Sequence, residues 1–233
     1  MNAVAVFRNQ FKEFIRDKFQ LLFFIIWALV TVAWPVISDL GFGESDNWDY
    51  PRQIAPALGV AVAGGFTIWI FASVVAKHRA NGYLSSVKLT SYLLGVSGFY
   101  ITLSMVMAVF IALVGLLSGL ALVNYMLIIL LVVICTMLLG AIIGVLSKNK
   151  DTALGVSYPL GIVLLGLIKA RNGVYALQIL DPIRPYIRWL YAERINNMLI
   201  EVHTGNFMSD VYVVLGNIAV LAIIFTFAIK RKM

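Results

Sequence analysis

Residues 96–147 read VSGFYITLSMVMAVFIALVGLLSGLALVNYMLIILLVVICTMLLGAIIGVLS, a stretch without a single Asp, Glu, Lys or Arg. A helix needs about 20 mostly apolar residues to cross the hydrocarbon core of a bilayer. This stretch is therefore long enough for two crossings, and we place them at about 96–120 and 125–147. It identifies the chain as an integral membrane protein.

The composition of the whole chain agrees with this class. Of its 233 residues, 61% are hydrophobic and only 12% are charged, whereas a soluble domain has about 25% charged residues. This excludes a soluble enzyme, a nucleic-acid-binding protein and a secreted domain held by disulfides. The only cysteine, Cys135, lies inside an apolar run and has no partner in the chain for a disulfide.

The apolar runs outside this stretch predict four further spans, so we expect an all-α membrane protein with six spans in one domain, 1–233. None of the six runs has a charged residue at its centre, and the fifth is the shortest and contains Pro159. The predicted spans are 19–38, 55–76, 96–120, 125–147, 152–168 and 211–229.

The positions of Lys and Arg predict the orientation, because cytoplasmic segments of membrane proteins are enriched in both. With both termini in the cytoplasm, the cytoplasmic segments hold most of the 18 cations, and the outer segments hold most of the 11 acids. We therefore expect a multi-pass protein of the inner or plasma membrane with both ends cytoplasmic. The cytoplasmic cations are then Arg8, Lys12, Arg16, Lys18, Lys77, Arg79, Lys88, Lys148, Lys150, Lys230, Arg231 and Lys232.

The segment before the first span has the spacing of an amphipathic helix. Phenylalanines and other apolar residues recur every three or four positions, with basic residues between them. We interpret 1–18 as a helix in the membrane interface, with its aromatic face in lipid. The alternative is a basic leader that only orients the first span. The residues that represent this entry helix are Phe11, Phe14, Ile15 and Lys18.

The loop after the second span, within 77–94, leaves the membrane with basic residues and is then broken by Gly82. A second amphipathic stretch follows, with Leu84, Val87, Leu89 and Leu93 as its apolar positions. We predict a short helix parallel to the membrane, which inserts into a groove of a soluble partner. The alternative is an ordinary connector in the interface.

The outer segment 169–210 is too long for an unstructured connection in a compact membrane domain. It contains Pro185, followed by a mixed aromatic and charged stretch to Ile200. We predict a small folded cap on the outer face, with a helix of about four turns at or above the membrane surface.

Two Gly-x-x-x-Gly pairs, Gly115/Gly119 and Gly140/Gly144, lie in the apolar runs. Such pairs allow two helix backbones to approach closely. We expect them to be packing sites within this chain more readily than a dimer face.

Several kinds of chemistry have no motif in the sequence. It contains no G-x-x-x-x-G-K-[ST] phosphate-binding loop and no H-E-x-x-H zinc motif. The spans have no ionisable residue at their centres, where carriers driven by protons or ions usually have one. We therefore expect no enzyme activity, no cofactor and no metal in this chain, and a source of energy in another protein.

Together these features resemble the membrane subunit of type-2 ATP-binding-cassette (ABC) exporters over essentially the whole chain. The shared features are the entry helix, six spans with both ends inside, a short helix after the second span and a longer outer segment before the last. Gly82, Leu84 and the pair Leu93-Leu94 match the loop pattern of that family. Residues 78–81 stand where the family has acidic residues, and Tyr83 replaces its Thr.

The resemblance implies a permease that forms a pore with a second copy or a paralogue, above two separate ATPase subunits that bind ATP and magnesium. It implies a coupling helix that contacts the ATPase through Tyr83, Leu84, Val87, Lys88 and Leu89, with the entry helix as a second contact. It also implies an apolar translocation wall from the second and fifth spans, formed by Phe66, Trp69, Ile70, Phe71 and Tyr158. Such a wall suits a hydrophobic or amphipathic cargo such as a peptide, drug or lipid.

Besides a permease, the sequence leaves two other functions open. The chain is either a permease or a membrane assembly or immunity subunit that transports nothing, and an efflux assay separates these two. A membrane enzyme acting on lipid is the third possibility, and it requires polar catalytic residues facing the interior of the bilayer.

Overall fold

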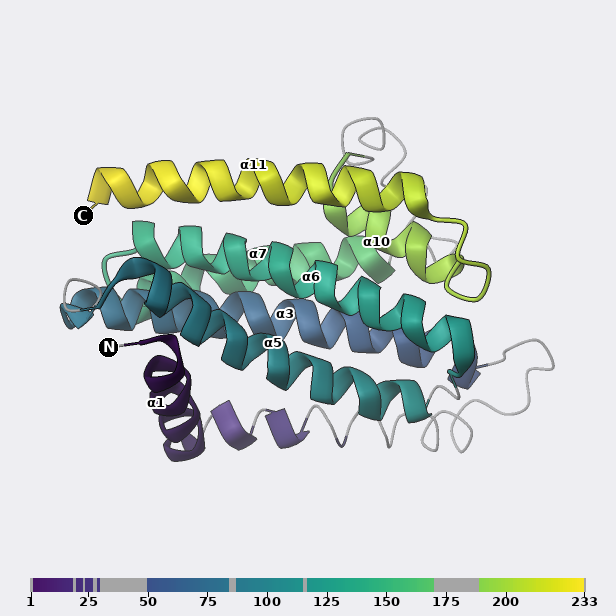
Figure 1. Cartoon of the computed structure of the whole chain (residues 1–233), viewed down its shortest axis with the longest axis horizontal. Coiled ribbons are helices and arrows are strands. Elements are labelled where there is room, and N and C mark those ends of the chain that lie inside the picture. The colour runs from purple at the N-terminus through teal and green to yellow at the C-terminus, as the bar shows by residue number, and fades with distance from the viewer. Residues whose placement is uncertain are drawn as a thin grey trace.

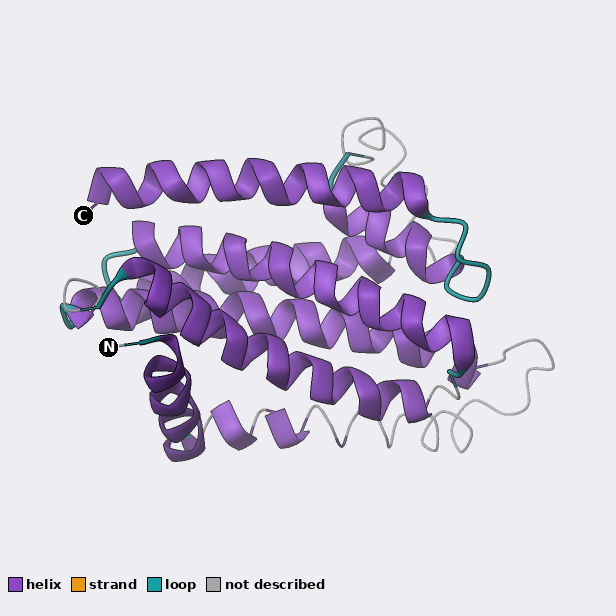
Figure 2. Cartoon of the chain, viewed as in Figure 1, coloured by secondary structure: helices purple, strands orange, loops and turns teal. Residues whose placement is uncertain are grey.

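A computed structural model of the chain describes residues 2–18, 20–22, 24–26, 29, 50–83, 87–114, 117–169 and 189–232. The described residues form helices and short connections without a β-strand (Figure 2). The helices are α1 (Ala3–Arg16), α3 (Tyr50–Ala80), α5 (Leu89–Val114), α6 (Gly119–Leu146), α7 (Lys150–Lys169), α10 (Tyr191–Ile200) and α11 (Met208–Lys232).

The long helices lie side by side in one bundle, and α1 lies across one end of it at a steep angle (Figure 1). Four helices are long and apolar enough to cross a membrane, over Gly59–Ala80, Leu89–Leu113, Gly119–Leu146 and Met208–Arg231. A helix satisfies its own backbone hydrogen bonds, so it is a stable form for such segments in lipid. The chain is therefore a multi-pass membrane protein.

The structure describes the other two predicted spans to different extents. The range 19–38 lies mostly outside the described residues, and those that are described, 20–22, 24–26 and 29, are helical. The range 152–168 is helical, as part of α7, with Pro159 inside the helix. However, α7 is not among the four helices of spanning length and hydropathy found in the described residues. The count of six spans stays a prediction.

Helix α3 occupies the centre of the bundle. In its spanning part 89% of the residues are buried within the protein, whereas only 22% are buried in the spanning part of α11. Helix α3 packs against α6, α7 and α5, and most extensively against α6. The exposed apolar face of α11, which includes Leu215, Ile223 and Phe227, therefore faces the bilayer.

Gly140 and Gly144 bring α6 into backbone contact with α3. A Cβ atom added at Gly140 would lie 2.9 Å from the carbonyl oxygen of Ile68. One added at Gly144 would lie 2.7 Å from the carbonyl oxygen of Ala72 and 2.7 Å from Cβ of Val75. The prediction that this pair is a packing site within the chain is confirmed.

Of the other glycine pair, Gly115 lies outside the described residues, and Gly119 is the first residue of α6. Gly119 has a φ of +56°, and a Cβ added there would meet no atom within 4 Å. The left-handed backbone explains the glycine at this position, and the prediction of a packing site there is wrong.

Helix α10 is shorter than predicted and packs on the bundle. It begins at Tyr191 and buries Tyr191, Ala192, Ile195 and Met198 against its neighbours. Asn217 Nδ2 on α11 donates a hydrogen bond of 2.9 Å to the carbonyl oxygen of Trp189. At 1.5 Å per residue, Asn217 lies about 13 Å along α11 from Met208. Helix α10 therefore lies beside one end of the spanning helices (Figure 1), and its place at or above the outer membrane surface stays a prediction.

The contact between α3 and α6 gives a first prediction. Gly144→Ala should lower the thermal midpoint of unfolding in detergent, measured by circular dichroism, because overfilling a packed site costs about 1–3 kcal/mol. Gly155→Ala on α7 is the matched control, since a Cβ there meets no atom within 4 Å. Equal midpoints for the two variants would contradict the close approach of α3 and α6.

Candidate functional site

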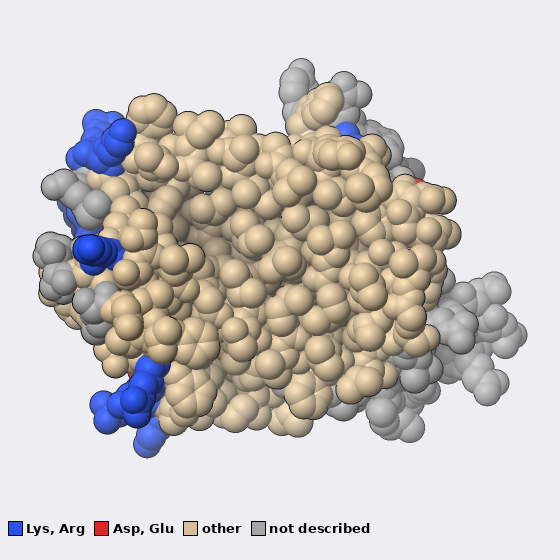
Figure 3. Space-filling view, in the orientation of Figure 1, with Lys and Arg blue, Asp and Glu red and all other residues tan. Residues whose placement is uncertain are grey.

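Lys and Arg residues gather at the end of the bundle where both termini of the chain lie (Figure 3). We call this end the cationic end. It comprises α1, the α3–α5 loop, the α6–α7 loop and the last turn of α11. The positive charge there suits contact with anionic lipid headgroups at one surface of the membrane.

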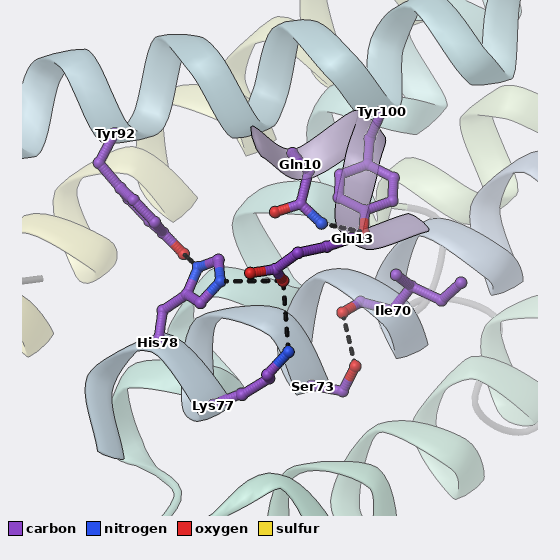
Figure 4. Close-up of polar contacts among 8 residues, drawn as sticks. All are labelled: Gln10, Glu13, Ile70, Ser73, Lys77, His78, Tyr92 and Tyr100. Carbon is purple, nitrogen blue, oxygen red and sulfur yellow. Dashed lines mark hydrogen bonds and ion pairs between the residues drawn. The ribbon is translucent and has the colours of Figure 1, made fainter. Parts of the chain in front are cut away.

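Glu13 connects α1 to the last turns of α3 (Figure 4). Its Oε2 atom lies 3.3 Å from Nζ of Lys77 and 3.5 Å from Nε2 of His78. The carboxylate of Glu13 and the ammonium of Lys77 are each about half exposed, so this ion pair contributes under about 1 kcal/mol. The contact with His78 reaches a more buried group, since the side chain of His78 is 8% exposed.

The buried ring of His78 in turn connects α3 to α5. Its Nδ1 atom shares a hydrogen bond of 3.0 Å with the hydroxyl of Tyr92, which is itself buried (Figure 4). The ring of Tyr83 lies 4.9 Å from that of His78, centroid to centroid. Tyr83 is the last described residue before Val87, so the start of the α3–α5 loop is held against these groups. We call Glu13, Lys77, His78, Tyr83 and Tyr92 the α1–α3–α5 cluster.

Next to this cluster, α1 packs along α5 through both polar and aromatic side chains. Gln10 Nε2 donates a hydrogen bond of 3.1 Å to the hydroxyl of Tyr100, and both residues are buried. The rings of Phe7 and Phe14 lie 5.7 Å and 5.6 Å from that of Phe99. The predicted amphipathic helix is confirmed as α1. Its aromatic face was expected in lipid, but it packs largely on α5.

Arg79 extends the connection to α6. Its Nη1 atom donates hydrogen bonds to the carbonyl oxygens of Val145 and Ser147, the second at 2.8 Å. A cation at the C-terminal end of a helix satisfies carbonyl groups that have no partner inside the helix, and it also stabilises the helix dipole. The end of α3 is thus fixed to α1, α5 and α6.

The residues predicted to contact an ATPase differ in their exposure. Lys88 is exposed, Tyr83 and Leu89 are partly buried, and Val87 is only 8% exposed. Leu84 lies outside the described residues. Of the five, Lys88 is the described residue that a partner protein reaches most easily.

Residues 84–86 of the expected short helix lie outside the described residues, and Val87 and Lys88 are not helical. Helix α5 begins at Leu89, ahead of the predicted start of the third span at residue 96. Leu89 and Leu93 therefore belong to the first turns of a spanning helix. Leu89 and Leu93 pack on the core of the bundle. This packing explains why the helix begins ahead of the apolar run.

The predicted entry-helix residues lie on different sides of α1 and just after it. Phe14 is buried, whereas Phe11 and Ile15 are about half exposed, at 49% and 50%. Lys18 follows the end of α1 and is exposed. Phe11 and Ile15 are therefore the apolar residues of this set that remain available to lipid or a partner.

The predicted translocation wall is only partly assembled. The rings of Trp69 on α3 and Tyr158 on α7 lie 4.8 Å apart. Phe66, Ile70 and Phe71 are instead buried within the chain. The rings of Phe66 and Phe71 each lie 5.8 Å from another ring of the bundle, that of Phe24 and that of Tyr100.

Sequence reasoning missed Glu13, His78, Tyr92 and Gln10 as members of a site. One signal was available: Glu13 is an acid on the otherwise basic polar face of α1. These four residues come together only because α1 crosses the ends of α3 and α5. The local spacing of residues does not specify that crossing.

Comparison with known proteins does not assign a function to this site. No family model matches the chain, and no curated protein matches it. Within the described residues there is also no group of three His, Cys, Asp or Glu side chains placed to hold a metal ion. The functional argument therefore depends on the cationic end itself.

The buried hydrogen bond of His78 gives a second prediction. Tyr92→Phe removes the hydroxyl and leaves Nδ1 of His78 without this partner, which should cost about 1–3 kcal/mol. A lower thermal midpoint in detergent is expected. Tyr212→Phe on α11 is the control, because Tyr212 is 67% exposed. If Tyr92→Phe unfolds at the same temperature as Tyr212→Phe, the hydrogen bond does not hold α3 to α5.

Proposed function

We propose that this chain is the membrane subunit of an ATP-driven exporter of the type-2 ABC kind. In this proposal separate ATPase subunits, which hold ATP and magnesium, bind at the cationic end. The observation that carries it is the α1–α3–α5 cluster, which joins the start of the α3–α5 loop to three helices at once. Such a connection is what a lever needs in order to pass motion from a soluble partner to the spanning helices.

The orientation follows from the charges. Cations at one end of a bundle favour the cytoplasmic side, so the cationic end and both termini are placed in the cytoplasm, at the inner or plasma membrane. The α3–α5 loop then faces the compartment that contains ATP.

The mechanism proposed is a motion of rigid elements. At one end of the loop Lys88 directly precedes α5, and at the other end the ring of Tyr83 packs on His78. His78 contacts Glu13 of α1 and Tyr92 of α5. Because these contacts join three helices, a displacement of the end of α3 should tilt α1, α3 and α5 together.

The architecture at the other end of the bundle supports the same family. Helix α10 lies between α7 and α11 in the chain and packs against α6, α7 and α11. This arrangement agrees with the longer segment before the last span that the resemblance implies. Through its contacts with α7, α10 would transmit a tilt of the bundle to the outer face.

The translocation path is proposed to run along the surface that Trp69 and Tyr158 share, between two copies of the chain or this chain and a paralogue. Aromatic side chains offer an apolar surface with polar edges. This suits a hydrophobic or amphipathic cargo, such as a peptide, drug or lipid.

The decisive experiment is co-purification and reconstitution. The tagged chain, expressed in its own cells and extracted in mild detergent, should bring down a soluble ATPase that contains a phosphate-binding loop. The reconstituted complex should hydrolyse ATP and export a hydrophobic dye from cells or vesicles. An ATPase absent from the complex, with efflux unchanged when the gene is deleted, would instead support a membrane assembly or immunity subunit.

The third prediction concerns Lys88. Lys88→Glu should weaken association with the ATPase by about tenfold, or about 1.4 kcal/mol, and lower ATP-dependent efflux in proportion. Lys148→Glu is the matched control, because Lys148 is also exposed at the cationic end but lies in the α6–α7 loop. Equal losses for the two variants would mean that only the overall charge of this end matters, and the role of the α3–α5 loop would be refuted.

A further inference from the structure

A cavity of about 200 Å³ lies between α1 and the start of the α3–α5 loop. It is lined by Asn9, Lys12, Glu13 and Arg16 of α1, with His78 at the end of α3 and Tyr83 beyond it. One water molecule needs only about 10–15 Å³ of such space. The cavity therefore accommodates a polar group much larger than a single water.

The charges that line this cavity favour an anion. Lys12 and Arg16 are four residues apart, so they lie on the same face of α1. Both are exposed, and neither forms an ion pair with any residue in the part of the chain that the structure describes. The negative charge of Glu13 is already balanced by Lys77 at 3.3 Å. Two cations beside the cavity are thus left without a counter-charge from the described residues.

The position of the cavity points to the source of the anion. Helix α1 lies across the cationic end of the bundle (Figures 1 and 3). Its apolar residues Phe11 and Ile15 are about half exposed beside the spanning helices. A helix with this arrangement lies at the depth where lipid headgroups and acyl chains meet. The phosphates of one leaflet are therefore at the height of Lys12 and Arg16.

We infer that the cavity between α1 and Tyr83 is a binding site for the phosphate of an anionic phospholipid. Lys12 and Arg16 donate charge-assisted hydrogen bonds to the phosphate oxygens, and Arg16 can donate two in parallel. The acyl chains lie along the exposed side chains of Phe11 and Ile15. The bound lipid connects α1 to the start of the α3–α5 loop and so stabilises their contact.

The fourth prediction tests this site by native mass spectrometry of the purified full chain in detergent. Phosphatidylglycerol should bind more tightly than phosphatidylcholine. The double variant Lys12→Gln/Arg16→Gln should lower the affinity for phosphatidylglycerol by about tenfold or more, since each basic residue near an anionic surface adds to the attraction for anionic lipid. Its circular dichroism spectrum should be unchanged, because both side chains are exposed.

The matched control is Lys230→Gln/Arg231→Gln, which removes the same charge from exposed residues at the same end of the bundle. It should keep the affinity for phosphatidylglycerol. An equal loss in both double variants, or a loss in neither, would overturn the site. Inorganic phosphate in excess is a further arm: if it displaces the lipid completely, the site takes free phosphate and the lipid assignment is wrong. None of these measurements involves an ATPase or transport, so the exporter proposal stands or falls separately.

Discussion

The close approach of α3 and α6 at Gly140 and Gly144 is the constraint on which the rest of the structure depends. It places α3 in the centre of the bundle, where most of its spanning part is buried. In lipid the burial of apolar side chains drives helix association much less than in water, so close backbone packing between helices matters more. Once α3 is central, its last turns lie at the middle of the cationic end, within reach of α1, α5 and α6.

The polar groups at that end follow from this position. His78 is buried because α1 and α5 both cover the end of α3, and it has a partner on each: Glu13 at 3.5 Å and the hydroxyl of Tyr92 at 3.0 Å. Buried polar groups are costly unless they are hydrogen-bonded. The cluster therefore specifies one arrangement of three helices, and a change at any member should be felt by the others. This property connects the packing of the bundle to the proposed transmission of motion from a partner.

The proposed lipid site and the proposed coupling site share α1, and Glu13, His78 and Tyr83 of the α1–α3–α5 cluster also line the lipid cavity. The coupling site uses Glu13, whose carboxylate faces Lys77 and His78. The lipid site uses Lys12 and Arg16, which have no ion-pair partner among the residues described. A helix that contacts protein on one face and lipid phosphate on another would respond to both. Transport and lipid composition would then be linked through the position of α1.

The sequence by itself determined the class of the protein, the amphipathic helix at the start, and the cation-rich end. These depend on composition and on local spacing, which a single helix already expresses. Only the tertiary structure decided that the face of Phe7 and Phe14 packs on Phe99, that α10 lies beside α11, and that Glu13 meets His78 and Tyr92. Each of these brings together residues far apart in the chain, and the physical reason is helix packing. Which apolar face meets a neighbour and which meets lipid depends on the fit of side chains between helices, and both faces are equally apolar in the sequence.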